Sequence, residues 1–394
     1  MPEETSTETP RREPRFLESL LLGTTVDRLP SLVPGVALAA VVVAASVGLA
    51  EWINEAWGFD GLVSFILVAI VVGMVIRNTI GLHPVFAPGV AFSLKKLLRL
   101  GIILLGIRLS ILDVLEIGAY GIPVVIGAVA TGLIVATAAT RWLGLSDRLG
   151  TLIAVGTGIC GATAIVATAP GIRARDEEVA YAVANITIFG IAAMFLYPFL
   201  GDLIFGGDIT KIGLFLGTSV HETAQVAGAG LIYDQSFDIA TSPSGADVAV
   251  IAKLVRNAFM VVAIPGITYV YARRLRSRGE ETGERTGMLQ LVPVFIIGFL
   301  AMAGLRSIGD AGLESGGHAF GLWSESAWSD VTHGIRTWAE YILGAAMAGV
   351  GLGTSIAQLR GLGVKPFAVG IAAAVSVGAV SIGLVFLFGP LISV

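Results

Sequence analysis

Lys253, Arg256 and Asn257 lie in a long apolar stretch, residues 246–272. The three side chains share one face of a helix, because Arg256 and Asn257 follow Lys253 by three and four positions. A charge at the centre of a membrane helix costs about 2.5–3.5 kcal/mol on insertion scales, so such charges usually have a function. Two cations and an amide suit an anionic substrate, and we assign all three residues to substrate binding. The alternative is a purely structural role.

His221, Glu222 and Gln225 lie in the middle of a second apolar stretch, residues 212–233, with glycines on both sides. This pattern predicts a discontinuous helix, and we assign the three residues to coupling with H⁺ or Na⁺. The alternative is a buried hydrogen-bonded cluster. His221-Glu222 also begins the zinc-protease pattern H-E-x-x-H, but Gln225 occupies the position of the second histidine. An intramembrane metalloprotease is therefore a remote alternative, and we expect neither a metal site nor enzymatic activity.

A glycine-rich sequence, GTGICGAT at residues 156–163, interrupts the apolar stretch 150–171. It contains G-x-G-x-x-G, but a dinucleotide site requires a preceding strand and a βαβ unit, so we expect no cofactor. A broken helix exposes N–H groups and a half-helix dipole that can hold an anion. Close helix packing through glycine is the alternative. The candidate substrate-binding residues of this segment are Thr157, Gly158, Cys160, Gly161 and Thr163.

Residues 349–355 repeat this character in another apolar stretch, with three alternate glycines followed by Thr354 and Ser355. We predict a second glycine-broken helix there, with Thr354 and Ser355 in the substrate site. Its alternative is a packing face, because Gly349 and Gly353 form G-x-x-x-G.

Arg108, Ser110 and Asp113 fall inside the apolar stretch 97–117. We assign them a structural or gating role. Arg108 and Asp113 could form a packing pair. Alternatively, they could lie nearer the membrane interface than the middle of a span.

Composition defines the class of protein that must position these residues. Of 394 residues, 55% are hydrophobic and 14% charged, against roughly 25% charged in soluble domains. The net charge of −4 argues against a nucleic-acid partner. We predict an all-α polytopic membrane protein, because apolar runs of about 20 residues match membrane-spanning helices. The predicted spans are 32–50, 62–80, 97–117, 121–140, 150–171, 178–200, 212–233, 246–272, 288–306, 338–360 and 366–392; residues 83–92 are predicted to be a surface turn.

Orientation follows from the distribution of basic residues. With the N-terminus inside, 18 of the 25 Lys and Arg residues fall on inside segments and four on outside segments. We therefore predict a plasma-membrane protein with a polar cytoplasmic tail at residues 1–30 and an outside C-terminus. Residues 31–394 form one transmembrane domain. After one extra helix, we predict two five-helix units that are inverted repeats, at about 62–200 and 212–392. The spans 150–171 and 338–360 would then be equivalent. Both would be broken helices, and they would cross near the midplane of the membrane.

Four segments carry a resemblance to a known family. GTGICGATAI from residue 156, SVHETAQVA from residue 219, KLVR from residue 253 and LLGIRLS from residue 104 resemble stretches of the YeiH-like family of inner-membrane proteins, often described as candidate sulfate exporters. Family members often have Ser-Ile-Cys-Gly-Asn-Ser-Ala where this chain has residues 158–164. The resemblance implies a fold like that of bile-acid symporters and sodium–proton antiporters, with crossed broken helices, and implies secondary transport.

We therefore predict a secondary transporter of a small anion, such as sulfate, a related oxyanion or an organosulfonate, coupled to H⁺ or Na⁺. An anion channel and an H⁺/Na⁺ antiporter-like carrier are the alternatives. The expected partners are the anion, the coupling ion and the lipid bilayer. Export is one of the two directions of transport that these residues allow. A homodimer is one of the oligomeric states that they allow.

Overall fold

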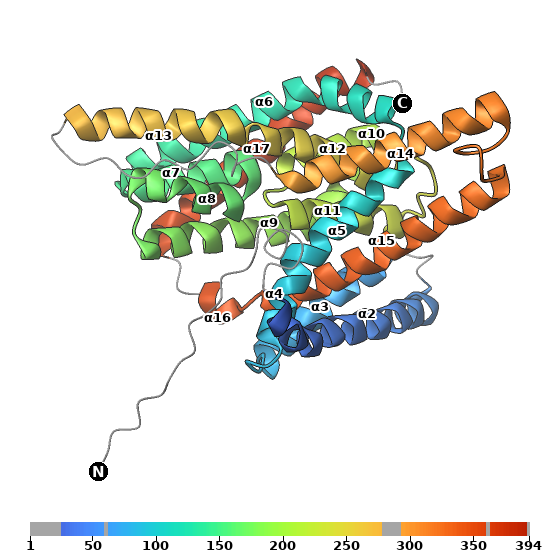
Figure 1. Ribbon diagram of the computed structural model, residues 1–394. Helices are drawn as coiled ribbons and strands as arrows, with labels where there is room; N and C mark the ends of the chain where they lie inside the picture. The colour runs from blue at the N-terminus through green and yellow to red at the C-terminus, as the bar shows by residue number, and fades with distance from the viewer. Residues whose placement is uncertain (1–24, 59–61, 278–292, 360–362, 392–394) are drawn as a thin grey trace, which may run out of the picture.

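The chain folds into helices throughout the part that the computed structural model describes, residues 25–58, 62–277, 293–359 and 363–391 (Figure 1). Among the described residues, six helices are long and apolar enough to cross a membrane, and Phe65–Thr79 is a shorter apolar helix. These helices confirm the predicted all-α membrane class. Most of the predicted tail at 1–30 lies outside the described residues.

Most of the long helices extend through the bundle as single elements. They are α2 (Leu29–Trp57), α6 (Ile111–Trp142), α9 (Asp176–Phe205), α14 (Val294–Gly316), α15 (Glu325–Gly353) and α17 (Val364–Phe388). α3 (Phe65–Thr79) is shorter. Two further segments consist of consecutive helices. One comprises α4 (Ala87–Phe92), the π-helix η2 (Ser93–Leu97), α5 (Leu98–Leu105) and the 3₁₀ turn η3 (Gly106–Arg108), and the other comprises α12 (Gly245–Ala258) and α13 (Met260–Ser277).

Polar residues at the turns determine where the helices begin. Ser64, Ser146, Asp208 and Ser244 each accept a hydrogen bond from the backbone N–H three residues later, at the starts of α3, α7, α10 and α12. Such caps satisfy donors that have no partner within the helix. Gly206 ends α9 in the left-handed conformation, with φ of 62°.

The predicted span 150–171 is wrong as a crossing segment, because the chain doubles back within it. α7 (Asp147–Val155) continues into a π-helical turn, η4 (Gly156–Cys160), and α8 (Ala162–Thr168) returns, followed by the 3₁₀ turn η5 (Pro170–Ile172). The two ends lie together, because Ser146 Oγ, before α7, donates to Glu178 Oε1 in the first turn of α9, at 2.7 Å. We call residues 147–172 hairpin 1.

The predicted span 212–233 is wrong in the same way. α10 (Ile209–Ser219) and α11 (Thr223–Ser236) are joined by three non-helical residues. Both legs pack against the start of α12: a Cβ on Gly213 would lie 2.9 Å from the carbonyl oxygen of Gly245, and one on Gly230 would lie 3.0 Å from Ala246 Cβ. We call residues 209–236 hairpin 2.

The two hairpins enter the bundle from opposite ends. α9 connects them, and its 30 residues make it about 45 Å long at 1.5 Å per residue. Hairpin 1 enters from the first face, where α6 ends and α9 begins, and hairpin 2 from the second face, where α9 ends and α12 begins. Figure 1 shows α7 and α8 together at the left of the view and α10 and α11 to their right. Each hairpin therefore reaches only partway through.

The region predicted as the span 97–117 is also corrected. The helical segment begins earlier, at Ala87, so that much of the predicted surface turn 83–92 is helical. Pro88 is tolerated because it lies in the first turn of α4. The segment ends at Arg108, and α6 begins at Ile111. Arg108, Ser110 and Asp113 therefore surround a turn at the second face, and Ser110 and Asp113 form the capping box of α6.

The span 338–360 is interrupted at the end of the glycine-rich stretch, where Thr354 and Ser355 are non-helical and a short helix, α16 (Ile356–Leu359), follows. α15 is continuous to Gly353, and its glycines allow close packing. On the facing helix, a Cβ on Gly73 of α3 would lie 2.8 Å from both Ala348 O and Leu352 N. The predicted interruption is thus present at Thr354 and Ser355, and the glycines that precede it pack closely against α3. The equivalence with the span 150–171 stays a prediction.

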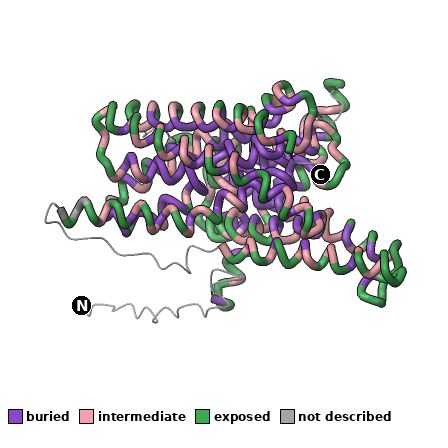
Figure 2. Tube along the Cα trace, turned by 90° about the horizontal axis from the view of Figure 1, so that it is seen from above, coloured by how far each residue is buried: buried purple, intermediate pink, exposed green. Residues whose placement is uncertain are grey.

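Burial is highest where hairpin 2 meets α12. Residues 212–219, 224–234 and 245–254 are all buried. Figure 2 shows buried positions gathered in the middle of the bundle and exposed ones toward its outer helices and ends. Hairpin 2 therefore lies in the core, enclosed by longer helices.

The hairpin assignment predicts the accessibility of introduced cysteines. Asp147→Cys and Asp176→Cys flank hairpin 1, and both should react with a membrane-impermeant maleimide from the same side of sealed membranes. Thr241→Cys lies at the second face and should react from the other side. The native Cys160 is buried, so the wild-type chain is the unlabelled control. Labelling of residues 147 and 176 from opposite sides would contradict the hairpin.

Candidate functional site

The tips of the two hairpins meet inside the bundle. Gly161 forms the tip of hairpin 1 with φ of 76° and ψ of −136°, a conformation that essentially only glycine adopts. A Cβ there would lie 3.2 Å from Glu222 Cβ. At the tip of hairpin 2, Val220 and Glu222 have extended backbone. Both helices are thus interrupted where the glycine and charge patterns predict, and we call this contact region the hairpin junction.

Arg256 of α12 binds backbone carbonyls of both tips. On hairpin 1, Nε donates to Gly158 O at 3.0 Å and Nη2 donates to Thr157 O. On hairpin 2, Nη1 donates to Thr218 O at 2.8 Å and to Val220 O at 3.1 Å. The side chain is fully buried, so these hydrogen bonds replace its hydration.

Lys253, one turn earlier on α12, binds the same two tips. Its Nζ donates to Ile159 O at 3.4 Å, Val220 O at 3.1 Å and His221 O at 2.5 Å. An ammonium group has three N–H donors, and all three have acceptors here. Lys253 is fully buried as well.

Lys253 and Arg256 therefore cap helix C-termini. The last carbonyls of a helix have no partner within it and carry the negative end of the helix dipole. The two side chains satisfy such carbonyls at the ends of η4 and α10 with seven hydrogen bonds. Four of the five arginine N–H groups are used in this way. The cations contribute positive charge to the junction, but nearly all of their donors are engaged by the protein.

The helix N-termini at the junction are more open. α8 begins at Ala162 and α11 at Thr223, next to the tips. Ala162, Glu222 and Thr223 are partly exposed and Thr163 is exposed, so this side of the junction is accessible. First-turn N–H groups and the positive end of a half-helix favour an anion. At α11 the Glu222 carboxylate is already at the N-cap, where it forms a capping box with Gln225.

Three buried polar atoms near the junction have no hydrogen-bond partner: Thr157 Oγ1, His221 Nε2 and Asn257 Oδ1. Asn257 donates through Nδ2 to Thr223 Oγ1 at 3.2 Å, which places its amide beside the start of α11. Buried polar groups are normally paired, so these atoms are candidates for contact with a ligand or water.

The three predicted coupling residues have different surroundings. His221 Nδ1 lies 3.1 Å from Ser219 O. Gln225 bridges two elements, because its Oε1 accepts from the Glu222 N–H at 3.3 Å and its Nε2 donates to Thr187 O on α9 at 3.4 Å. Glu222 remains as a carboxylate at the tip contact, and it is the group best placed to exchange a proton or cation.

Cys160 joins the tip of hairpin 1 to the start of α13. It is buried, and its Sγ lies 2.8 Å from Met260 Sδ at the start of α13. The thiol thus packs against the point where α12 joins α13. This geometry supports a structural role for Cys160.

Thr354 and Ser355 are placed apart from these contacts. The polar partners of this segment are at the end of α3, where Asn78 Nδ2 donates to Thr354 O at 3.0 Å and Asn78 Oδ1 accepts from the Ile356 N–H at 2.7 Å. Thr354 Oγ1 donates to Val350 O within its own helix. No hydrogen bond among the described residues joins these two residues to Lys253 or Arg256.

Arg108 belongs to a second polar cluster, at the second face. Its Nε lies 3.1 Å from Asp247 Oδ2 and its Nη1 lies 3.7 Å from Glu340 Oε1, so it joins η3 to α12 and α15. Asp113 is instead the capping partner of Ser110. Asp247 and Glu340 were not predicted from the sequence. Ser244 and Asp247 are spaced as a capping box, which was a readable signal for Asp247.

The described residues around His221 do not form the set of metal ligands that the metalloprotease alternative requires. Among the described residues, no three His, Cys, Asp or Glu side chains lie close enough together to hold a metal ion. The Gln225 amide, at the position of the missing second ligand, is engaged with Glu222 and Thr187.

Comparisons with known proteins cover most of the chain. A family model described as Conserved hypothetical protein 698 matches residues 34–370. UPF0324 membrane protein PA5383 of Pseudomonas aeruginosa is 34% identical over 351 residues, which cover 86% of this chain and 89% of that protein. UPF0324 membrane protein Atu0671 of Agrobacterium fabrum is 33% identical over 362 residues (91% and 94%). UPF0324 inner membrane protein YeiH of Escherichia coli K12 is 33% identical over 341 residues (85% and 88%).

Removing the arginine cap should destabilise the fold even without ligand. Arg256→Met leaves up to four buried carbonyls without their donor, and we expect the free energy of unfolding to fall by about 3–5 kcal/mol. Arg256→Lys, which keeps the charge, should lose less. Arg306→Met removes a partly exposed ion pair with Asp310 and should cost less than about 1 kcal/mol. The measurement is unfolding of purified protein in anion-poor buffer. Unchanged stability of Arg256→Met there would assign the guanidinium to ligand binding.

The tip of hairpin 1 should tolerate only glycine. Gly161→Ala forces a side chain into a disfavoured backbone conformation against Glu222, and we expect it to cost about 1–3 kcal/mol of stability. Gly334→Ala is the matched control: its added Cβ meets nothing within 4 Å, and alanine favours the helix. Equal melting temperatures for the two variants would show that the tip is not constrained as described.

Proposed function

The chain belongs to the family described as Conserved hypothetical protein 698, with UPF0324 membrane proteins as its relatives, and on this premise we propose that it is a secondary transporter of a small anion. The observation that carries the proposal is the hairpin junction. Two half-membrane hairpins from opposite faces meet there, and their C-terminal carbonyls are held by Lys253 and Arg256. The N-termini of α8 and α11 lie on the accessible side of the junction, with Glu222 at the N-cap of α11. Discontinuous helices that meet inside a membrane are a recurring form of transporter substrate site.

The charge balance of the junction favours an anion. Lys253 and Arg256 contribute two positive charges and Glu222 contributes one negative charge when ionised. The capped C-termini of η4 and α10 are neutralised by the cations, whereas the N-terminus of α8 keeps its partial positive charge and that of α11 faces the N-cap carboxylate of Glu222. An anion bound at Thr157, Thr163 and Thr223 would complete the balance.

The proposed topology has nine membrane crossings and two re-entrant hairpins instead of eleven crossings. The crossings are α2, α3, the segment 87–108, α6, α9, the α12–α13 segment, α14, α15 and α17. With the first face cytoplasmic, Arg173 and Arg175 in the turn between hairpin 1 and α9 join the basic inside segments, and Lys211 at the start of hairpin 2 moves to the outside. The inverted pair is then hairpin 1 with hairpin 2, in place of the spans 150–171 and 338–360.

Coupling is assigned to Glu222. Its backbone is part of the tip of hairpin 2, its β-carbon faces Gly161 of hairpin 1, and its side chain is partly exposed. Binding of H⁺ or Na⁺ there changes the charge of the junction and hence its affinity for an anion. The substrate class, sulfate or a related oxyanion or organosulfonate, and export as the direction follow the resemblance to the YeiH-like family.

Counterflow into proteoliposomes tests the proposal. Wild-type protein should exchange labelled sulfate, or another oxyanion of a panel, saturably and against an internal pool. Uptake should also respond to an imposed H⁺ or Na⁺ gradient. Glu222→Gln should lose at least tenfold of the gradient-driven uptake and keep anion exchange, because the carboxylate is removed and the N-termini remain.

Glu314→Gln, an exposed carboxylate on α14, is the matched control and should behave as wild type. Flux without saturation or counterflow would establish a channel. Absence of flux for every oxyanion, in protein that is folded by its melting curve, would refute the proposed function.

A further inference from the structure

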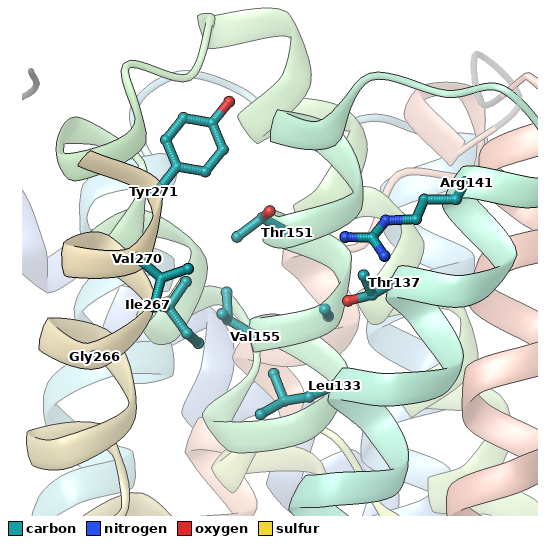
Figure 3. A pocket seen from close by; sticks show the side chains of 10 residues that line it. Leu133, Thr137, Arg141, Thr151, Val155, Gly266, Ile267, Val270 and Tyr271 are labelled. Atoms are coloured by element: carbon teal, nitrogen blue, oxygen red, sulfur yellow. The ribbon is translucent and has the colours of Figure 1, made fainter. Parts of the chain in front are cut away.

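A cavity of about 260 Å³ lies behind hairpin 1, between α6, α7 and α13 (Figure 3). Its deeper wall is apolar and includes Leu133, Val155 and Ile267, and its rim is polar and includes Thr137, Arg141 and Thr151. The cavity belongs to neither polar cluster described above. Its two halves differ in chemistry, which indicates an amphipathic occupant.

The rim has the groups that bind a phosphate. Figure 3 shows the Arg141 guanidinium pointing toward the side chains of Thr137 and Thr151. The guanidinium forms no ion pair with a described residue, although Asp147 lines a small recess beside it. Thr151 Oγ1 donates to Asp147 O, which leaves the hydroxyl oxygen free to accept. A guanidinium with adjacent hydroxyls matches the oxygens of a phosphate or another tetrahedral oxyanion.

The surroundings of the cavity are those of a membrane interface. Trp142, next to Arg141, is 86% exposed, and Tyr269 on α13 is 60% exposed. Exposed Trp and Tyr residues concentrate at the level of lipid headgroups. Val270 lines the cavity and is 50% exposed, so the apolar wall is continuous with the outer, lipid-facing surface of α13.

We propose that this cavity binds an anionic phospholipid. The phosphate lies against Arg141, Thr137 and Thr151, and an acyl chain covers Leu133, Val155 and Ile267. A free oxyanion shares the headgroup chemistry but would leave the apolar wall uncovered. Basic pockets between helices at a membrane face are known to select anionic headgroups. The proposal depends on membrane insertion and is independent of the proposed transport function.

The bound lipid would support hairpin 1 from outside the junction. Val155 is the last residue of α7, and the η4 turn that follows it supplies Thr157 O and Gly158 O to Arg256. An acyl chain on Val155 therefore packs against the same hairpin leg that Arg256 holds from the inside. Lipid binding should accordingly stabilise the folded protein.

Thermal unfolding of the full-length protein in detergent tests the headgroup. Phosphatidylglycerol should raise the melting temperature more than phosphatidylcholine with the same chains, and inorganic phosphate should not. Arg141→Gln should weaken the phosphatidylglycerol effect about fivefold in half-maximal concentration. Arg148→Gln, a basic residue on the same face that does not line the cavity, should leave the effect unchanged.

Gly266→Leu tests the chain site. An added Cβ at Gly266 meets nothing within 4 Å and Gly266 lines the cavity, so a leucine side chain can fill it without a clash. The variant should fold with its lipid-free melting temperature preserved and lose the phosphatidylglycerol response. Equal stabilisation by inorganic phosphate would identify a free-anion site and overturn the proposal. Equal responses to both lipids, or an unchanged response in Arg141→Gln or Gly266→Leu, would overturn it as well.

Discussion

The structure depends on two buried cations that hold the ends of two helices. A hairpin that turns inside a membrane leaves carbonyls at its tip without partners, and each unsatisfied group costs several kcal/mol in an apolar medium. Lys253 and Arg256 supply those partners for both tips from a single helix, α12. The energetic cost of burying the cations is offset by the same hydrogen bonds. The hairpins can therefore stop partway through the bundle, and they can meet there.

This arrangement makes the junction electrically asymmetric. The helix C-termini are closed by side chains, whereas the N-termini of α8 and α11 point into a partly accessible space beside Thr163 and Glu222. A polar site is thus built mainly from backbone ends, and the charged side chains act chiefly as supports. A substitution of Lys253 or Arg256 would therefore remove both the support and part of the field. For that reason, a loss of the proposed transport in such variants would not by itself identify a ligand contact.

The sequence predicted the residues of the junction better than their roles. Glycines and charges inside apolar runs are costly, and for that reason Gly161, Glu222, Lys253 and Arg256 were recognisable. The role of the two cations depends on which carbonyls come near them, and no spacing rule reports that. The turn at Arg108 was missed because the apolar residues continue on both sides of it. The glycines of α15 were ambiguous, because close packing and helix breaking use the same residue.

The hairpins themselves escaped prediction because each contains about as many apolar residues as a single crossing helix. Replacing two crossings by hairpins leaves the two ends of the chain on opposite sides of the membrane, as with eleven crossings. Only α9, between the hairpins, reverses its direction. The distribution of basic residues was therefore consistent with eleven crossings. Of the four basic residues that this count places outside, two, Arg173 and Arg175, lie at the first-face end of α9, the helix whose direction changes in the nine-crossing topology.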